Sequence, residues 1–170
     1  MPANPETIYS FPPVATPHAT ILILGSMPGQ ASLAANQYYA YKQNAFWKIM
    51  AELLPFDVND SYPAKIQALK TADIALWDVL QSCKRQGSLD NKIRTETEIP
   101  NDFSTFFQQH KLIHQIFFNG AKAETYFKRN ILLHIHLASY QLTRLPSTSP
   151  AHASQSFDEK LAIWRTALSV

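Results

Sequence analysis

The chain has 170 residues, of which 46% are hydrophobic and 16% are charged, and its formal net charge is +2 at pH 7. These values exclude an intrinsically disordered chain, because the apolar content is ample for a core, and they predict one domain over residues 1–170. The small positive charge permits nucleic acid as a partner but does not by itself indicate one.

The single cysteine, Cys83, excludes an internal disulfide framework, and we expect it to be a small buried hydrophobe. The N-terminal segment lacks the basic stretch and the continuous apolar stretch of a signal peptide. No apolar run approaches the roughly 20 residues that a membrane-spanning helix needs. The sequence therefore predicts a cytoplasmic protein with no membrane partner.

Three elements are predicted in the first third of the chain. Residues 1–19 are predicted to form an extended, proline-punctuated arm that packs on the domain. The run TILILG, residues 20–25, is typical of a strand that is buried on both faces and ended by glycine. From Asn44 the pattern takes the period of a helix that ends near Pro55, with apolar positions at Phe46, Met50, Leu53 and Leu54.

Three further apolar runs predict strands at residues 73–80, at 112–120 and within 134–145. A polar loop is predicted from Gln81, a helix over 121–130, and a closing helix with apolar positions at Phe157, Leu161, Trp164 and Leu168. Strands that alternate with helices predict an α/β fold with a mostly parallel sheet covered on both faces. In such folds ligands bind at the carboxyl ends of the strands.

The first of these strand ends carries GSMPG, residues 25–29, which has neither the spacing of a dinucleotide-binding loop nor the lysine of a phosphate-binding loop. One interpretation is a plain turn, in which Gly25 allows a positive φ and Pro28 stiffens the corner. The alternative is that its backbone N–H groups face a ligand and that Met27 adds an apolar wall.

Asn44 and the aromatic residues around it also allow two interpretations. Asn44 precedes a helix and is a favoured N-cap, but its amide is also able to orient water or donate to a ligand. The aromatic residues are either core residues or the walls that hold a flat heterocycle; they are Tyr38, Tyr39, Phe46 and Trp47.

Residues 145–154, LPSTSPAHAS, are dense in Ser, Thr and Pro after an apolar strand. Ser147 or Ser149 is either a cap of the last helix, or part of a rigid loop whose hydroxyl and N–H groups hold a DNA phosphate. His134 and His136 are predicted to share one face of a half-buried strand, and without a third ligand nearby they do not indicate a metal site.

In this order, GSMPG, YY and NAFW, then ALWDVLQSC and GSLD, and finally LPSTSPA resemble the DNA-deoxyinosine (hypoxanthine-DNA) glycosylase family of the uracil-DNA glycosylase superfamily. The resemblance runs from about Phe11 to the C-terminus. It implies a three-layer α/β/α fold around a four-stranded mostly parallel sheet, with a pocket at the strand carboxyl ends, no metal and no cofactor. The implied partner is double-stranded DNA that contains a deaminated base.

Departures from related families refine this resemblance. Uracil-specific relatives have an Asp, and mismatch-type relatives an Asn, where this chain has Met27. That difference fits the hypoxanthine family, whose catalytic Asn lies in NAFW and matches Asn44. The second-motif His of uracil enzymes is replaced by LPSTSPA, and His152 follows where the family is expected to have Asn.

The resemblance also implies roles for individual residues. Asn44 is the expected catalytic residue, which positions water or contacts the leaving base. Tyr39, Phe46 and Trp77 are expected to stack on a flipped base, and Asp78 to read its edge. The expected substrate-binding set is Gly25, Ser26, Met27, Pro28, Gly29, Tyr39, Phe46, Trp77 and Asp78, and the expected DNA-binding set is Ser147, Ser149, Pro150 and His152.

The sequence thus predicts a monomeric, monofunctional glycosylase that flips hypoxanthine out of DNA and hydrolyses its N-glycosidic bond. No Lys lies in the strand-end motifs, so lyase chemistry is not expected. The alternatives are a mismatch-type uracil-DNA glycosylase and a non-catalytic α/β domain that binds nucleotides or damaged DNA.

Overall fold

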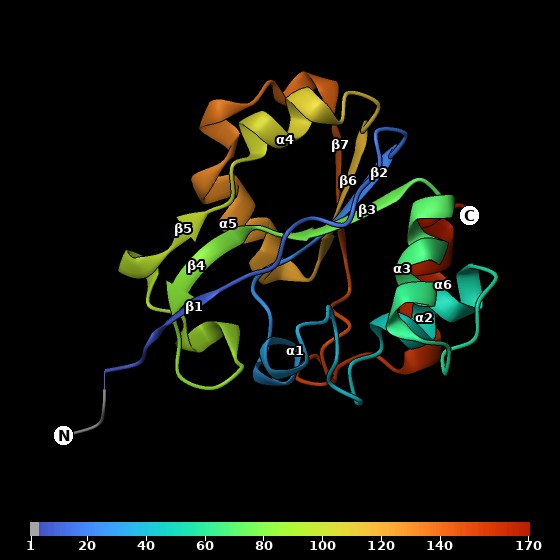
Figure 1. The fold of residues 1–170 in the computed structure, drawn as a ribbon, viewed down its shortest axis with the longest axis horizontal. Helices are drawn as coiled ribbons and strands as arrows, with labels where there is room; N and C mark the ends of the chain where they lie inside the picture. Colours follow the sequence, from blue (N-terminus) through green and yellow to red (C-terminus); the bar gives the residue numbers. More distant parts are fainter. Residues whose placement is uncertain (1–3) are drawn as a thin grey trace.

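The centre of the molecule is a four-stranded parallel sheet, seen edge-on between two groups of helices in Figure 1. The computed structural model describes residues 4–170. The order is β3-β2-β6-β7, and the strands are β3 (Ile74–Asp78), β2 (Ile21–Gly25), β6 (Gln115–Asn119) and β7 (Gln141–Leu145). The register sets Gly25 beside Asp78 and Asn119 beside Leu145, so all four carboxyl ends meet at one edge. Each predicted strand is confirmed.

Alternate residues of β2 supply two separate cores. Ile21 and Ile23 pack against α2 (Phe46–Leu53), α3 (Tyr62–Thr71) and α6 (Phe157–Leu168). Leu22 and Leu24 face the opposite layer, which contains α4 (Phe103–Gln109) and α5 (Ala121–Asn130). Figure 1 shows the two groups of helices on opposite sides of the sheet. A strand buried on both faces is apolar throughout because successive side chains point in opposite directions. The three-layer α/β/α fold is confirmed.

A second, antiparallel sheet joins the chain's beginning to the segment after β3. Its order is β1-β4-β5, with strands β1 (Thr7–Tyr9), β4 (Leu80–Lys84) and β5 (Ile99–Pro100). The polar loop predicted from Gln81 therefore contains most of a strand, which its composition did not indicate because residues such as Ser82 are polar yet buried. Cys83 is fully buried, as expected. The arm packs on the domain through β1 and through Val14, which pairs with Leu76; residues 1–3 lie outside the described residues.

Several short elements were not predicted from the sequence. They are α1 (Gln30–Ala35) and the 3-10 helices η1 (Asp90–Lys92), η2 (Thr95–Thr97), η3 (Leu132–His134) and η4 (Leu137–Ser139), besides α3 and α4. The prediction that His134 and His136 share a strand face is wrong. His134 ends η3 and both are exposed, because β7 begins later, at Gln141. None of the helices described is both long and apolar enough to span a membrane.

Candidate active site

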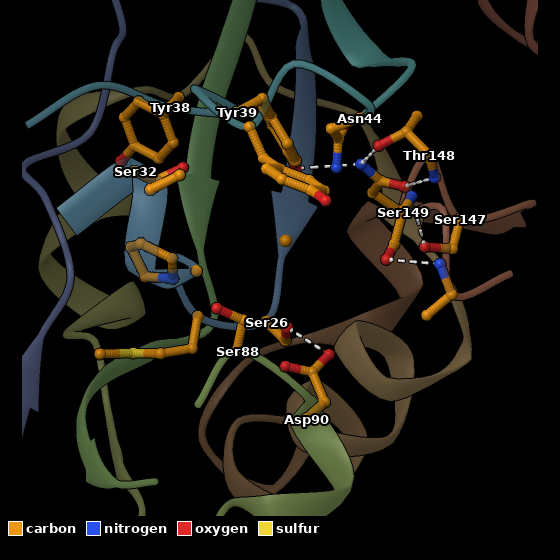
Figure 2. Close-up of a pocket in the computed structure, with 18 of the residues that line it drawn as sticks. Ser26, Ser32, Tyr38, Tyr39, Asn44, Ser88, Asp90, Ser147, Thr148 and Ser149 are labelled. Carbon is orange, nitrogen blue, oxygen red and sulfur yellow. Dashed lines mark hydrogen bonds between the residues drawn. The ribbon is translucent and has the colours of Figure 1, made fainter. Parts of the chain in front are cut away.

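A cavity of about 620 Å³ opens at the carboxyl edge of the sheet. Figure 2 shows Tyr39, Asn44 and the Ser147–Ser149 segment along one side, with Ser26 and Asp90 across from them. The cavity therefore gathers segments that follow all four parallel strands. Its lining includes Gly25, Ser26, Met27, Pro28, Gly29, Ser32, Tyr38, Tyr39, Tyr41, Asn44, Asp78, Ser88, Leu89, Asp90, Asn119, Ser147, Thr148, Ser149 and Pro150.

The GSMPG segment forms the floor. Its first two carbonyl groups accept hydrogen bonds from the chain after β3: Val79 N donates to Gly25 O at 2.9 Å and Leu80 N to Ser26 O at 3.1 Å. A Cβ atom at Gly25 would lie 2.4 Å from Asp78 Oδ1, so only glycine fits where the Asp78 side chain lies against the end of β2. Gly25 is therefore required by this close approach rather than by a positive φ.

The side-chain amide of Asn119, at the end of β6, joins two loops from either side. Its Nδ2 donates to Tyr39 Oη at 3.0 Å and to Thr148 Oγ1 at 2.9 Å, and its Oδ1 accepts from Thr148 N at 2.9 Å. Thr148 O in turn accepts from Ala45 N at 2.9 Å, just before α2. Both amide hydrogens of Asn119 are used within the protein, so this residue orders the wall of the cavity.

Tyr39 presents an aromatic face that is fixed from behind. Its ring stacks on Phe46 with centroids 4.1 Å apart and planes at 22°, and Phe46 itself is fully buried. The backbone of Tyr39 has φ of 54°, an uncommon conformation for a bulky residue that costs on the order of 1–3 kcal/mol. Such strain persists where surrounding contacts impose it, here the stacking and the bond from Asn119.

Asn44 lines the cavity just before α2. Its Oδ1 accepts a hydrogen bond from Phe46 N at 2.9 Å, which forms a turn of the Asx type just before α2. The N-cap of α2 is Ala45, so the interpretation of Asn44 as the N-cap is wrong by one residue. The amide nitrogen Nδ2 has no hydrogen-bond partner among residues 4–170. The hydrogen bond from Phe46 N thus restrains the amide and leaves a donor available to a ligand.

Asp78 ends β3 as a buried carboxyl in the cavity wall, with 4% of its surface exposed. Its Oδ2 atom is buried without a hydrogen-bond partner among the described residues. Desolvation by burial and, to a smaller extent, the charge of Asp90 raise its pKa to about 7, against the opposing charge of Arg85. Arg85 is itself held by the GSMPG turn, because its Nη2 donates to Pro28 O at 2.5 Å.

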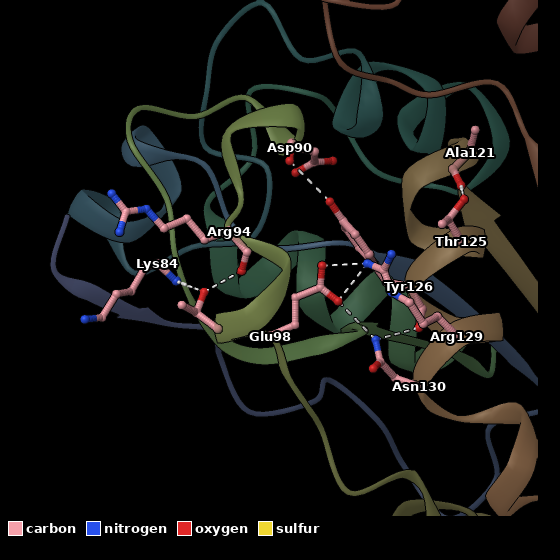
Figure 3. A network of polar contacts seen from close by, with 10 residues as sticks. Lys84, Asp90, Arg94, Glu98, Ala121, Thr125, Tyr126, Arg129 and Asn130 are labelled. Atoms are coloured by element: carbon pink, nitrogen blue, oxygen red, sulfur yellow. Dashed lines mark hydrogen bonds and ion pairs between the residues drawn. The ribbon is translucent and has the colours of Figure 1, made fainter. Parts of the chain in front are cut away.

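Asp90 is held over the cavity from two directions. Its Oδ2 accepts from Ser26 Oγ at 2.7 Å, and its backbone carbonyl accepts from Tyr126 Oη, on α5, at 3.2 Å. Figure 3 shows Tyr126 between Asp90 and the pair in which Arg129 Nη2 donates to both Glu98 oxygens, at 2.6 and 2.8 Å. Among residues 4–170, no group of three or more His, Cys, Asp or Glu side chains is placed to bind a metal ion.

The serine-rich loop differs from expectation in how its backbone is used. Ser149 N donates to Ser147 Oγ at 3.1 Å and Ala151 N to Ser149 Oγ at 3.2 Å, while Thr148 N is taken by Asn119. These N–H groups are therefore not available to a phosphate, but the two serine hydroxyl hydrogens are. Lys160 from α6 lies behind the loop, and its Nζ donates to His152 O at 2.7 Å.

Three of the expected site residues lie away from the cavity. Trp77 packs against Phe103 and Phe106 in the other layer, because neighbours along a strand point to opposite faces and Asp78 takes the cavity side. Phe46 supports Tyr39 from behind, and the His152 ring pairs with Gln155. Their positions do not support the stacking and DNA contacts expected of them. The other expected residues all line the cavity.

Sequence reasoning passed over several polar residues that the structure brings to the cavity. Asn119 was visible as the Asn-Gly pair at a strand end, and Thr148 lies between the two serines that were selected. Ser88 and Asp90 follow β4 and lie in the GSLD motif, which contributed to the family resemblance but was assigned no role in the site. The strand-end position of Asn119 and this motif were the two usable signals.

Comparisons with known proteins agree on the family of this fold. The sequence model of the Uracil DNA glycosylase superfamily matches residues 12–168. A protein of Methanosarcina barkeri named "Hypoxanthine DNA glycosylase" is 39% identical over 117 residues, 68% of this chain and 73% of its own. A Methanosarcina acetivorans protein of the same name is 37% identical over 143 residues, 84% of this chain and 86% of its own.

A solved structure is also similar. The solution NMR structure of a Methanosarcina acetivorans protein, described as a candidate uracil DNA glycosylase, superposes with a TM-score of 0.77 at 32% sequence identity. The superposition covers 97% of this chain and 100% of the other. The likeness thus extends over nearly the whole of both chains.

Replacement of two glycines of the floor by alanine, one at a time, tests the close approach of the Asp78 side chain to Gly25. Gly25→Ala would set a methyl group 2.4 Å from Asp78 Oδ1 and 3.0 Å from Tyr39 Oη, so we expect the free energy of unfolding to fall by about 1–3 kcal/mol. Gly29→Ala is the control, because its Cβ would meet Ser88 Oγ at an ordinary 3.5 Å. Urea unfolding measures the free energy of unfolding of both variants. Equal stabilities would contradict the close approach of the Asp78 side chain to Gly25.

Proposed function

The chain belongs to the uracil-DNA glycosylase superfamily, and from that premise we propose that it is a monofunctional DNA glycosylase that excises hypoxanthine in base excision repair. The observation that carries the substrate is the similarity to two proteins named Hypoxanthine DNA glycosylase, at 39% and 37% identity. The cavity agrees with it, because apolar Met27 stands in the floor where uracil-specific relatives carry an acidic residue.

The reaction breaks the bond between C1′ of the sugar and N9 of the base through an oxocarbenium-like transition state. The base must first leave the duplex, which costs on the order of a few kcal/mol and least for a mispaired base. The cavity of about 620 Å³ is large enough for a flipped purine, and the face of Tyr39 offers a stacking platform. Donors aimed at the negative charge that develops on the leaving base then lower the barrier.

Asn44 is the donor best placed for this role. Its Oδ1 is bound to Phe46 N, so rotation of the amide is restrained and Nδ2 is left to meet the base. Binding of the departing base by Nδ2 strengthens as negative charge develops, because hydrogen bonds to charged acceptors are about twice as strong as neutral ones. Asn44 thus acts by stabilising the leaving group, and the hydrogen bond from Phe46 N maintains its position.

The mouth of the cavity supplies contacts to double-stranded DNA. Ser147 and Ser149 keep hydroxyl hydrogens for phosphate oxygens, Pro150 lies beside them, and buried Lys160 adds a positive charge behind the loop. In this proposal, residues 1–170 act as one domain and one monomer in the cytoplasm, without a metal or cofactor. A phosphate contact fixes the register of the enzyme on the duplex and leaves the choice of base to the cavity.

The similarity to a structure described as a candidate uracil DNA glycosylase favours uracil as the second candidate substrate. The test is release of base from duplexes that carry a single hypoxanthine, uracil or xanthine, followed by alkaline cleavage of abasic sites. We expect release of hypoxanthine to be fastest. Faster release of uracil would reverse the order, and binding of damaged duplex without release of any base would instead identify a non-catalytic domain.

Two substitutions of Asn44 separate the structural hydrogen bond of its Oδ1 with Phe46 N from the proposed role of its Nδ2 donor in the reaction. Asn44→Asp keeps an oxygen for Phe46 N but loses the amide donor, so hypoxanthine release should fall by about 10²–10³-fold with little change in Tm. Asn44→Ala should lose the same activity and also about 1 kcal/mol of stability, because the hydrogen bond to Phe46 N is lost as well. Single-turnover release measures the loss of activity in each variant, and thermal melting measures the loss of stability expected only of Asn44→Ala. Wild-type release by Asn44→Asp would show that the amide donor is not used.

The serine hydroxyls should contribute to affinity rather than to base choice. Ser147→Ala and Ser149→Ala each remove a hydrogen bond worth about 0.5–1.5 kcal/mol, so binding should weaken roughly three- to tenfold on damaged and undamaged duplexes alike. Ser104→Ala, exposed on α4, is the control. Fluorescence anisotropy with both duplexes measures the effect, and a change in the preference for damaged DNA would contradict this role.

A further inference from the structure

Asp78 combines features that reading a base edge does not require. Its carboxyl lies in the cavity wall, is 4% exposed and has one oxygen, Oδ2, without a partner among the described residues. It is packed so tightly that Oδ1 would lie 2.4 Å from a Cβ on Gly25. An ionised carboxylate in such a place would lack the hydrogen bonds that buried charges require. The geometry therefore favours the neutral acid, which is a hydrogen-bond donor.

The charged and titratable groups around Asp78 support the same protonation state. Asp90, on η1, is negative and disfavours a second negative charge; Arg85, after β4, has the opposite effect. Tyr38 and Tyr39, from the loop before α2, face the same region and burial raises the pKa of both phenols, so they stay neutral. Burial outweighs the pull of Arg85 and raises the pKa of Asp78 to about 7.

We propose that Asp78, as the carboxylic acid, is the general acid that donates its proton to a ring nitrogen of the departing hypoxanthine. This inference rests on the proposed function. As the C1′–N9 bond breaks, its electron pair passes to the purine, and the proton of Asp78 moves to the N3 or N7 lone pair. Hypoxanthine then leaves as a neutral molecule. Water bonds to C1′ and releases a proton to solvent, from which the Asp78 carboxylate is reprotonated.

This step also discriminates between bases. A purine attached through N9 has lone pairs on N3 and N7, both conjugated with the breaking bond. Uracil attached through N1 has no such ring nitrogen, because its other nitrogen already carries hydrogen. An acid at Asp78 therefore assists the release of hypoxanthine more than that of uracil, whose acceptors are carbonyl oxygens, weaker bases than a purine ring nitrogen. Together with Met27 in place of an acidic residue, it accounts for a purine substrate in a uracil-glycosylase fold.

The proposal predicts the direction of the pH dependence. The active form is protonated, so hypoxanthine release should be level at acidic pH and fall about tenfold per pH unit above neutrality. Asp78→Asn keeps the shape but has no acidic proton, so release should drop by about 10²-fold or more and lose this alkaline limb. Asp90→Asn removes a neighbouring negative charge, lowers the pKa of Asp78, and should move the limb to lower pH.

Stability gives a second measurement that does not depend on catalysis. The folded state binds a proton at Asp78 that the unfolded state loses near its ordinary pKa of 3.8, so wild-type stability should fall as pH rises from 4 to 7 and then level off. Asp78→Asn has no titrating group at this position and therefore does not lose stability in this way. Its Tm should exceed that of the wild type more at pH 8 than at pH 5, whereas Asp102→Asn, exposed at the start of α4, should show no such trend.

The decisive experiment is single-turnover release of hypoxanthine from duplex DNA between pH 5 and pH 9 by the wild type and the Asp78→Asn, Asp90→Asn and Asp102→Asn variants. Loss of the limb in Asp78→Asn and its displacement in Asp90→Asn support the proposal. A limb that persists in Asp78→Asn, or a Tm difference that is equal at pH 5 and pH 8, overturns it. Absence of hypoxanthine release by the wild type would refute the proposed function instead.

Discussion

The hydrogen bonds of the Asn119 side chain hold the cavity wall together. One amide, at the end of the central strand β6, binds Tyr39 from the loop between α1 and α2 and Thr148 from the loop after β7. These loops carry no regular structure of their own, so their relative position depends on this amide. Through Thr148 O and Ala45 N the same set reaches the start of α2, and with it Asn44. The orientation of the candidate catalytic amide thus depends on a residue that need not touch the base.

The chemistry of the site follows from how closely the Asp78 side chain approaches Gly25, its neighbour on the paired strand. The absence of a side chain at Gly25 lets the Asp78 carboxyl lie against the end of β2, where water does not reach Oδ2. Met27 keeps the floor apolar, and in such surroundings a neutral carboxyl is favoured over a charged one. A glycosylase for purines gains from this arrangement, because its leaving group accepts a proton that a carboxylate is unable to give.

Apolar runs predicted the four parallel strands, because strands buried on both faces are apolar throughout, and helical periods predicted α2, α5 and α6 but not α3 and α4. The β1-β4-β5 sheet had no such apolar pattern, since β4 contains polar residues such as Ser82 that are buried through tertiary contacts. At the site, the polar segments that follow the predicted strands correctly indicated where the cavity lies. They did not show that Trp77 faces the other layer, or that Asn119 and Thr148 pair across 29 residues of sequence.

The central claim is that this cavity receives a flipped hypoxanthine. It is tested most directly by the crystal structure of the protein bound to a duplex that contains 2′-fluoroarabino-deoxyinosine, whose glycosidic bond resists cleavage. The account predicts the purine inside the cavity, stacked on Tyr39, with Asn44 Nδ2 and the Asp78 carboxyl within hydrogen-bond distance of its ring or carbonyl atoms. A purine that stays stacked in the duplex, or that binds with Asn44 and Asp78 both out of contact, would contradict it.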